Sequence, residues 1–92
     1  NKDGSPLMAA AVKGYNTIAR LLLNAGADPN LEDMNQTTAL HYAAMFKNHE
    51  LALLLLEAGA DPHHKNNVGQ SPMDYVIVQN DERMHNIFKI KN

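Results

Sequence analysis

The fold is decided by a stretch that occurs twice, first as Leu21-Leu22-Leu23-Asn24-Ala25-Gly26-Ala27-Asp28-Pro29 and then as Leu54-Leu55-Leu56-Glu57-Ala58-Gly59-Ala60-Asp61-Pro62. The two glycines are 33 residues apart, and so are the two aspartates. The same step relates Ser5-Pro6-Leu7, Thr38-Ala39-Leu40 and Ser71-Pro72-Met73. A fixed period near this length indicates a solenoid, in which one helical pair is stacked repeatedly. Such a fold offers an extended binding surface, and it has no single central cleft.

Each period predicts two helices. The first is expected to begin after Ser5, Thr38 or Ser71, whose hydroxyls can cap free amides at a helix start. We expect these first helices at about 6–12, 39–46 and 72–79, and the second helices at about 16–24, 49–57 and 82–90. Asn48 and Asp81 are candidate caps of the second helices. Gly26 and Gly59 are expected to end their helices in the left-handed conformation that glycine adopts most easily.

These motifs have the pattern of a known family. Thr38-Ala39-Leu40-His41-Tyr42-Ala43-Ala44, followed by a Leu-rich helix and Ala58-Gly59-Ala60-Asp61, resembles the ankyrin repeat. The family pattern reads Thr-Pro-Leu-His-x-Ala-Ala and then Leu-Leu-x-x-Gly-Ala-Asp. The resemblance covers nearly the whole chain and implies an all-α ankyrin-repeat solenoid of helix-turn-helix units joined by hairpin fingers. The expected organisation is one domain, 1–92, with repeats at about 1–32, 33–65 and 66–92 and fingers within 28–37 and 61–70.

Some positions depart from the family pattern. Met8 and Asp74 replace the expected histidine, and Lys47 and Asn80 replace a glycine. The resemblance implies that the remaining histidine, His41, hydrogen-bonds backbone near its own loop.

The two ends of the array are expected to differ. A last repeat needs a polar outer face, and Arg83, Lys89 and Lys91 suit a C-terminal capping repeat. The first repeat has the apolar pattern of an interior repeat, at Ile18, Leu21 and Leu22. We therefore expect the chain to be the C-terminal part of a longer array, with a preceding short helix as the alternative cap. An exposed first repeat would fray or self-associate, and otherwise a monomer is expected.

Composition excludes several functional classes. The 92 residues carry a formal net charge of −2, which disfavours nonspecific nucleic-acid binding. The absence of cysteine excludes a disulfide framework and a thiolate metal site, and it fits an intracellular location, cytoplasmic or nuclear. The apolar stretch 51–56 is too short to span a bilayer, so no membrane partner is expected.

No catalytic or metal-binding motif is complete. His63 and His64 follow Asp61, but adjacent residues of an extended hairpin point to opposite sides, so one ion cannot easily take both. His49-Glu50 begins a zinc-protease motif, yet the second histidine is replaced by Leu53. We predict that the protein is not an enzyme and needs no metal or cofactor.

The resemblance implies that a partner protein meets the fingers and the first helices. The corresponding positions are Val12, Lys13, Glu32, Met34, Asn35, Thr37, Met45, Phe46, Lys65, Asn67, Val68, Gln70, Val78 and Gln79. Phe46 beside Met45 is a candidate hot spot, and the alternative, that Phe46 fills a gap between repeats, stays open. Asn30 resembles the site modified by asparaginyl hydroxylases, although a side chain that hydrogen-bonds the hairpin backbone is the favoured interpretation.

The predicted function is non-catalytic recognition of another protein through the concave face and the fingers. The alternative is a spacer or regulatory ankyrin segment of a larger enzyme or channel, with no independent partner. A catalytic or transmembrane domain upstream in the same gene product would favour that alternative.

Overall fold

The structure, a computed structural model, describes residues 6–91, and this range contains six helices and no strand. The helices are α1 (Pro6–Lys13), α2 (Asn16–Asn24), α3 (Ala39–Met45), α4 (His49–Glu57), α5 (Pro72–Gln79) and α6 (Glu82–Lys91). The all-α prediction is confirmed, and every predicted helix end agrees with the structure to within one residue.

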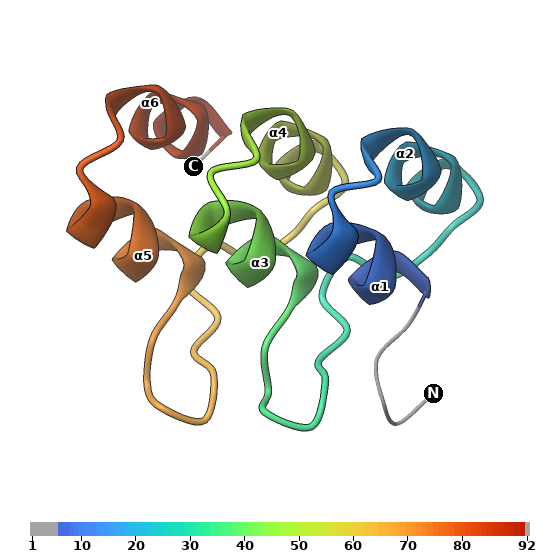
Figure 1. Ribbon diagram of the computed structural model, residues 1–92, viewed down its shortest axis with the longest axis horizontal. Helices are drawn as coiled ribbons and strands as arrows, with labels where there is room; N and C mark the ends of the chain where they lie inside the picture. Colours follow the sequence, from blue (N-terminus) through green and yellow to red (C-terminus); the bar gives the residue numbers. More distant parts are fainter. Residues whose placement is uncertain (1–5, 92) are drawn as a thin grey trace.

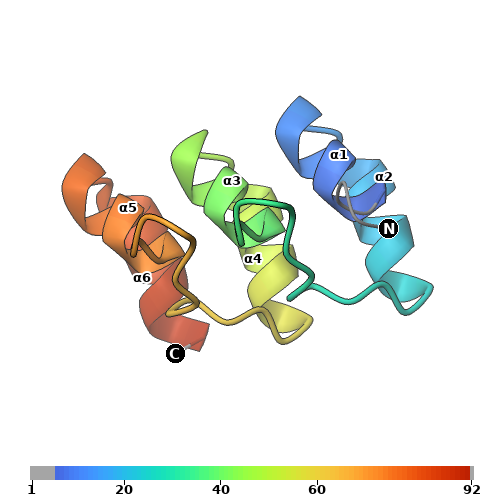
Figure 2. The same ribbon diagram turned by 90° about the horizontal axis from the view of Figure 1, so that it is seen from below.

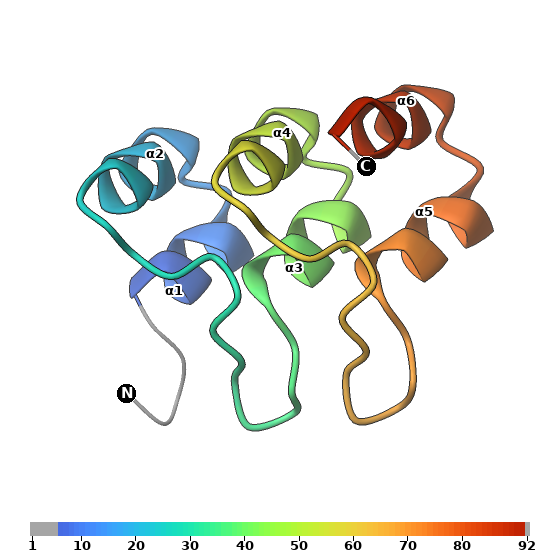
Figure 3. The same ribbon diagram turned by 180° about the vertical axis from the view of Figure 1, so that it is seen from behind.

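The helices form two layers (Figure 1). The inner helices α1, α3 and α5 lie in one row and contact their neighbours in order, and the outer helices α2, α4 and α6 do the same in a second row. The three helical pairs are stacked along the longest axis of the molecule, which measures 32 Å. The loops 25–38 and 58–71 protrude beyond the inner row, and Figures 2 and 3 show them side by side.

Left-handed backbone marks the helix ends that the period predicts. Gly26 and Gly59 have φ of 98° and 102° after the outer helices, as expected. The turns between inner and outer helices pass through Gly14, Lys47 and Asn80, with φ of 76°, 57° and 54°. The turn therefore keeps its geometry where lysine or asparagine replaces glycine, and the lysine has the less suitable side chain for it.

Side-chain caps start most of the helices. The Ser71 hydroxyl accepts a hydrogen bond from the backbone N–H of Asp74, whose carboxylate accepts one from the Ser71 N–H. Asp74 thus completes a capping box in place of the family's histidine. Asn48 and Asp81 cap α4 and α6 as predicted, each 3.3 Å from a backbone nitrogen three residues on. Ser5 lies outside the described residues.

Small residues let the inner helices approach closely. Ala10, Ala11, Ala43 and Ala44 are at most 3% exposed, and between the layers lie large apolar side chains that are fully buried. These are Leu51, Leu55, Met84 and Phe88.

The two ends expose different surfaces. The predicted apolar end face of the first repeat is open to solvent, with Ile18 48% and Leu21 59% exposed. At the opposite end Arg83 and Lys89 are exposed, as a polar capping face requires. That end also exposes Ile77, at 58%, which the sequence analysis did not anticipate. Asn92 and the side chain of Lys91 lie outside the described range.

Candidate partner-binding surface

The two fingers, residues 33–37 and 66–70, are built in the same way. In the first finger, Asp33 Oδ1 accepts hydrogen bonds from the backbone nitrogens of Asn35 at 2.9 Å and Thr37 at 3.0 Å. In the second, Asn66 Oδ1 accepts bonds from two backbone nitrogens, both at 3.1 Å. One side-chain oxygen therefore organises each finger from inside, and the tip residues are left exposed.

The fingers are also joined to each other at their tips. The backbone N–H of Asn67 donates to the backbone oxygen of Asn35, with the two atoms 2.9 Å apart. Met34 and Val68 flank this bond and are 78% and 69% exposed. The tips therefore form a tied pair of loops that presents apolar side chains to solvent.

Tyr42 connects the first finger to the inner helix α3. Its hydroxyl donates to Asp33 Oδ2 at 2.7 Å. Burial and this bond raise the pKa of Tyr42 to about 12. Burial alone would raise the pKa of Asp33, but the bonds from Tyr42, Thr37 and Asn35 outweigh it, and this pKa is lowered. The finger is thereby fixed against the helix by a charge-assisted hydrogen bond.

His41 connects the middle repeat to the second finger. Its Nδ1 accepts the backbone N–H of Thr38 at 3.0 Å, so the ring proton belongs on Nε2, which donates to the backbone oxygen of Gln70 at 2.9 Å. The ring is fully buried, and burial lowers the pKa of His41. The bond near its own loop agrees with the resemblance, and the bond to the next finger is new.

An exposed apolar row crosses the inner helices. We give this name to Val12, Met45 and Val78, which occupy the same position in the three repeats. Val12 is 47% exposed, Val78 is 80% exposed and Met45 is half-buried. Beside the row, Phe46 is 54% exposed and its ring stacks on Tyr42, with centroids 6.2 Å apart. Phe46 is therefore a surface residue, supported on one face by an anchored tyrosine.

The other predicted contact residues differ in how far they reach the surface. Lys13, Lys65, Asn67 and Gln70 are exposed. Glu32 is exposed, and its carboxylate lies against the Nε2 atom of His64. Gln79 is half-buried, and its amide donates to the backbone oxygen of Met45 at 3.1 Å. Thr37 is only 6% exposed, because the finger folds its side chain inward, so a partner would not reach it.

Asn30 links the first connecting loop to the next one. Its amide nitrogen donates to the backbone oxygen of Gly59 at 3.0 Å, and its oxygen accepts the backbone N–H of Asp61 at 2.8 Å. These bonds are those of a structural asparagine that holds hairpin backbone. The residue is nevertheless exposed, and its hydroxylation stays a prediction.

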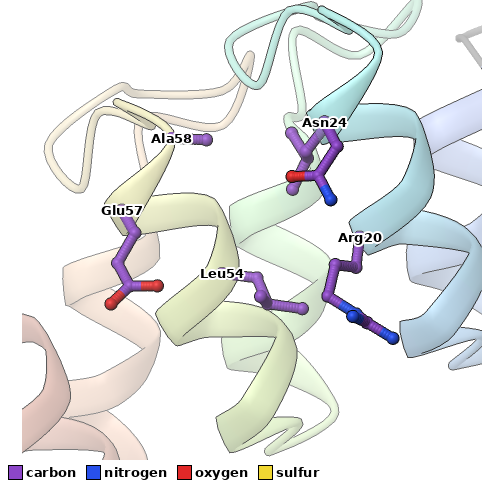
Figure 4. Close-up of a pocket in the computed structure, with 6 residues that line it drawn as sticks. Arg20, Asn24, Leu54, Glu57 and Ala58 are labelled. Atoms are coloured by element: carbon purple, nitrogen blue, oxygen red, sulfur yellow. The ribbon is translucent and has the colours of Figure 1, made fainter.

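A shallow pocket lies on the opposite, outer layer, between α2 and α4 (Figure 4). Arg20, Asn24, Leu54, Glu57 and Ala58 line it together with Leu23. Its volume of about 260 Å³ is below the roughly 300–1,000 Å³ of small-molecule sites. A second hollow, of about 390 Å³, lies at the open side of the first pair and is lined mainly by apolar residues, among them Leu7, Leu22 and Leu31. The inner surface carries the predicted contact residues, and we take it as the candidate site.

Residues 6–91 contain neither a cluster of metal-binding side chains nor a membrane-spanning helix. In that range no group of three or more histidine, aspartate or glutamate side chains is arranged to hold a metal ion. No helix there is both long and apolar enough to cross a bilayer.

Sequence reasoning did not single out two residues that belong to this surface. Tyr42 occupies the variable position of the motif. Its hydroxyl is held by Asp33, and its ring stacks on Phe46, so it supports the exposed phenylalanine. Lys47 replaces a turn glycine and adds an exposed cation beside the apolar row. The sequence contained one signal for Lys47, namely that it replaces a glycine of the family pattern.

Known proteins with a similar sequence contain the same repeat. The family described as ankyrin repeats, in three copies, matches residues 1–66. An ankyrin repeat-containing protein of Treponema pallidum (strain Nichols) is 47% identical over 77 residues, which cover 84% of this chain and 26% of that protein. An ankyrin repeat protein of fowlpox virus (strain NVSL) is 37% identical over 86 residues, or 91% of this chain and 20% of that protein.

A third relative is named as a regulatory subunit of an enzyme. Protein phosphatase 1 regulatory subunit 12A of Mus musculus is 38% identical over 71 residues, or 77% of this chain and 7% of the subunit. The chain thus spans about a quarter or less of the length of these relatives.

Proposed function

Since the chain belongs to the ankyrin-repeat family, we propose that it is a non-catalytic module that binds another protein through its inner helices and fingers. One observation carries the proposal. Val12 on α1 and Val78 on α5 expose 47% and 80% of their surfaces, and Phe46, directly after α3, exposes 54%. Neighbouring apolar side chains left in solvent on one face of a protein are typical of a binding site.

The surroundings of these residues have the layout of an interface. Apolar side chains are exposed on and beside the inner helices, and exposed polar side chains, Lys13, Asn35, Asn67 and Gln70, lie at the end of α1 and on the fingers. Interfaces generally combine such a desolvated core with a solvated rim. The bonds that fix Tyr42 and the finger tips support the proposal further, because a preorganised surface loses less entropy on binding.

The alternative is a regulatory segment within a larger protein. It is favoured by the name of the phosphatase regulatory subunit and by the small share of each relative that the chain covers. In that case the same surface would meet another part of the assembly. The two hypotheses differ in one observable property: an independent binding module would bind a separate protein when isolated, and a segment of a larger protein would not.

The test is affinity capture with matched variants. The protein, Phe46→Ala and Leu53→Ala would each be used to capture proteins, and the captured partner would be titrated against all three. Leu53 is an exposed apolar residue of α4, on the outer layer, so its variant controls for loss of apolar surface away from the site. Phe46→Ala is expected to weaken binding by about 2 kcal/mol, as truncation of a hot spot does.

The stability of each variant must be measured on the same samples. Phe46→Ala is expected to change the free energy of unfolding by no more than about 0.5 kcal/mol, the usual range for a surface change. A partner bound equally well by all three proteins would contradict the proposal. So would a large loss of stability with unchanged affinity, which would make Phe46 a packing residue.

A further inference from the structure

We propose that the apolar row and Phe46 receive an amphipathic α-helix of the partner, with acidic residues along the flank that faces Lys13 and Lys47. The inference rests on the proposed function and specifies the kind of partner. Three features support it: the spacing of the row, the polar groups beside the row, and the charges of Lys13 and Lys47.

The spacing of the row matches a helix. Packed helices lie about 8–10 Å apart, so Val12, Met45 and Val78 present contacts at about that interval. A partner helix advances about 1.5 Å per residue, and seven residues cover about 10 Å in almost two full turns. One side of the helix therefore faces the row at every seventh residue.

An extended strand does not match the row. A strand advances about 3.3 Å per residue, so about three residues cover the same interval. Side chains three apart on a strand point to opposite faces, and every second contact would be lost. Within residues 6–91 there is also no strand whose edge could pair with an added one.

A polyproline helix matches the spacing but not the polar groups. Its side chains repeat every three residues, about 9.3 Å, and its carbonyl groups have no internal partners, so they bond water or donors of the protein. Two donors beside the row are already engaged, because the Tyr42 hydroxyl donates to Asp33 and the Gln79 amide donates to Met45. An α-helix satisfies its own backbone and needs neither.

The length of these three repeats sets how much of a partner helix they can contact. The molecule extends 32 Å along the axis on which the pairs are stacked, which a helix of about 21 residues would span. A partner helix needs about 15 residues to contact Val12, Met45 and Val78 together, because its first and last contacting residues are separated by two intervals of about seven residues.

The charge beside the row predicts the flank of the partner. Lys13 ends α1 and Lys47 follows α3, and both are exposed. Neither ammonium forms an ion pair with another residue of the described range. The acidic groups of Asp33 and Glu32, on the finger side of the inner helices, are engaged with Tyr42 and His64. Two partner carboxylates about seven residues apart would complement the two lysines.

The test compares two displayed peptide libraries on the intact chain. One library has 21-residue helix-forming peptides with an alanine-rich background, and the other has proline-rich peptides of the same length and the same randomised positions. We expect enrichment from the helical library, with apolar residues seven apart and acidic residues on one flank. Phe46→Ala is expected to weaken the selected peptides at least tenfold, and Leu53→Ala is expected to leave them unchanged.

Charge reversal tests the flank. Lys13→Glu with Lys47→Glu is expected to weaken binding severalfold at about 50 mM salt and less at about 500 mM, where charges are screened. Arg83→Glu with Lys89→Glu makes the same change of charge on α6 and is expected to have no effect.

Each contrary result identifies what fails. Binders from the proline-rich library alone, lost in Phe46→Ala, would overturn the helical partner and leave the proposed function standing. Helical binders indifferent to the reversal at Lys13 and Lys47 would overturn the acidic flank. If neither library gave Phe46-dependent binders, the helical inference would fall, and the capture experiment would decide the function separately.

Discussion

At the scale of single residues, His41 has the most informative environment. The ring is buried, it bonds Thr38 and Gln70, and His64 and Tyr75 lie edge-on to it at 6.2 Å and 6.0 Å between ring centroids. Burial lowers its pKa from the ordinary 6.5, the backbone bond to Gln70 opposes this, and the charge of His64 lowers it further. Asp33 is the nearby acidic group, and it acts to raise this pKa.

This environment predicts how stability depends on pH. A lowered pKa in the folded state means that the unfolded chain binds the proton first as the pH falls below about 6.5. Folding is then disfavoured progressively until the pH passes the folded pKa. We expect the free energy of unfolding to fall more steeply between pH 7 and 5 for the native protein than for His41→Gln.

Urea unfolding at several pH values measures this difference in slope. The lowered pKa values of Asp33, Asp74 and Asp81 do not confuse the comparison, because their ordinary value of 3.8 lies below this window. Equal slopes would show that His41 is not buried as a neutral ring.

Leu55 gives a second prediction at this scale. It is fully buried in the middle repeat, and its helix α4 contacts both α2 and α6. Leu55→Ala is expected to lower the free energy of unfolding by about 2–5 kcal/mol, through lost apolar burial and the cavity that remains. Urea unfolding with Leu53→Ala as the exposed control checks it. A loss below about 1 kcal/mol would mean that the core lies elsewhere.

At the scale of elements, the inner–outer turn after α3 is one of two places in the described residues where a side chain other than asparagine has left-handed backbone; the other is Gln36 in the first finger, with φ of 60°. Lys47 has φ of 57°, whereas Gly14 occupies the equivalent position with φ of 76°. A side chain in left-handed backbone costs about 1–2 kcal/mol, and asparagine tolerates it better than lysine. Substitution by glycine removes the steric cost but adds chain entropy to the unfolded state.

Lys47→Gly is therefore expected to raise the free energy of unfolding by about 0.5–1 kcal/mol, and Asn80→Gly by less. Lys89→Gly, within the exposed part of α6, is the control with the opposite sign, since glycine lowers helix stability by about 0.5–1 kcal/mol. Thermal melting of the three variants and the native protein ranks them by stability. If Lys47→Gly were no more stable than the native protein, the strain at this turn would be negligible.

At the scale of the whole molecule, the stack is unevenly covered. The middle pair, α3 and α4, is packed on both sides, whereas α1 and α2 have one neighbouring pair. The open side of the first pair exposes Ile18 and Leu21, and Pro6, Leu7 and Leu22 line an apolar hollow there.

This arrangement predicts graded protection from hydrogen exchange. Amides of α1 and α2 are expected to exchange faster than those of α3 and α4, because opening the first pair breaks a single interface. Exchange measured by mass spectrometry at several protein concentrations checks it. Slower exchange in α2 at high concentration would reveal association through the open face, and uniform protection in a strict monomer would contradict the prediction.

The period, the helices and their ends could all be predicted from local patterns of residues. These features depend on local rules, such as glycine or asparagine in left-handed turns and hydroxyl or carboxylate caps, and such rules act over about four residues. The sequence also indicated the exposed tips at Met34 and Val68 and the apolar residue Val78. The apolar stripe of the middle repeat indicated its core, and Leu51 and Leu55 are fully buried there.

The role of each surface side chain depends instead on contacts between repeats. Thr37 and Gln79 were candidate contacts, yet the first is folded inward and the second bonds the preceding inner helix. Tyr42 reaches Asp33, and His41 reaches a finger 29 residues further along the chain. No local pattern encodes these outcomes, because a polar side chain takes its partner from whatever the neighbouring repeat places within about 3 Å of it.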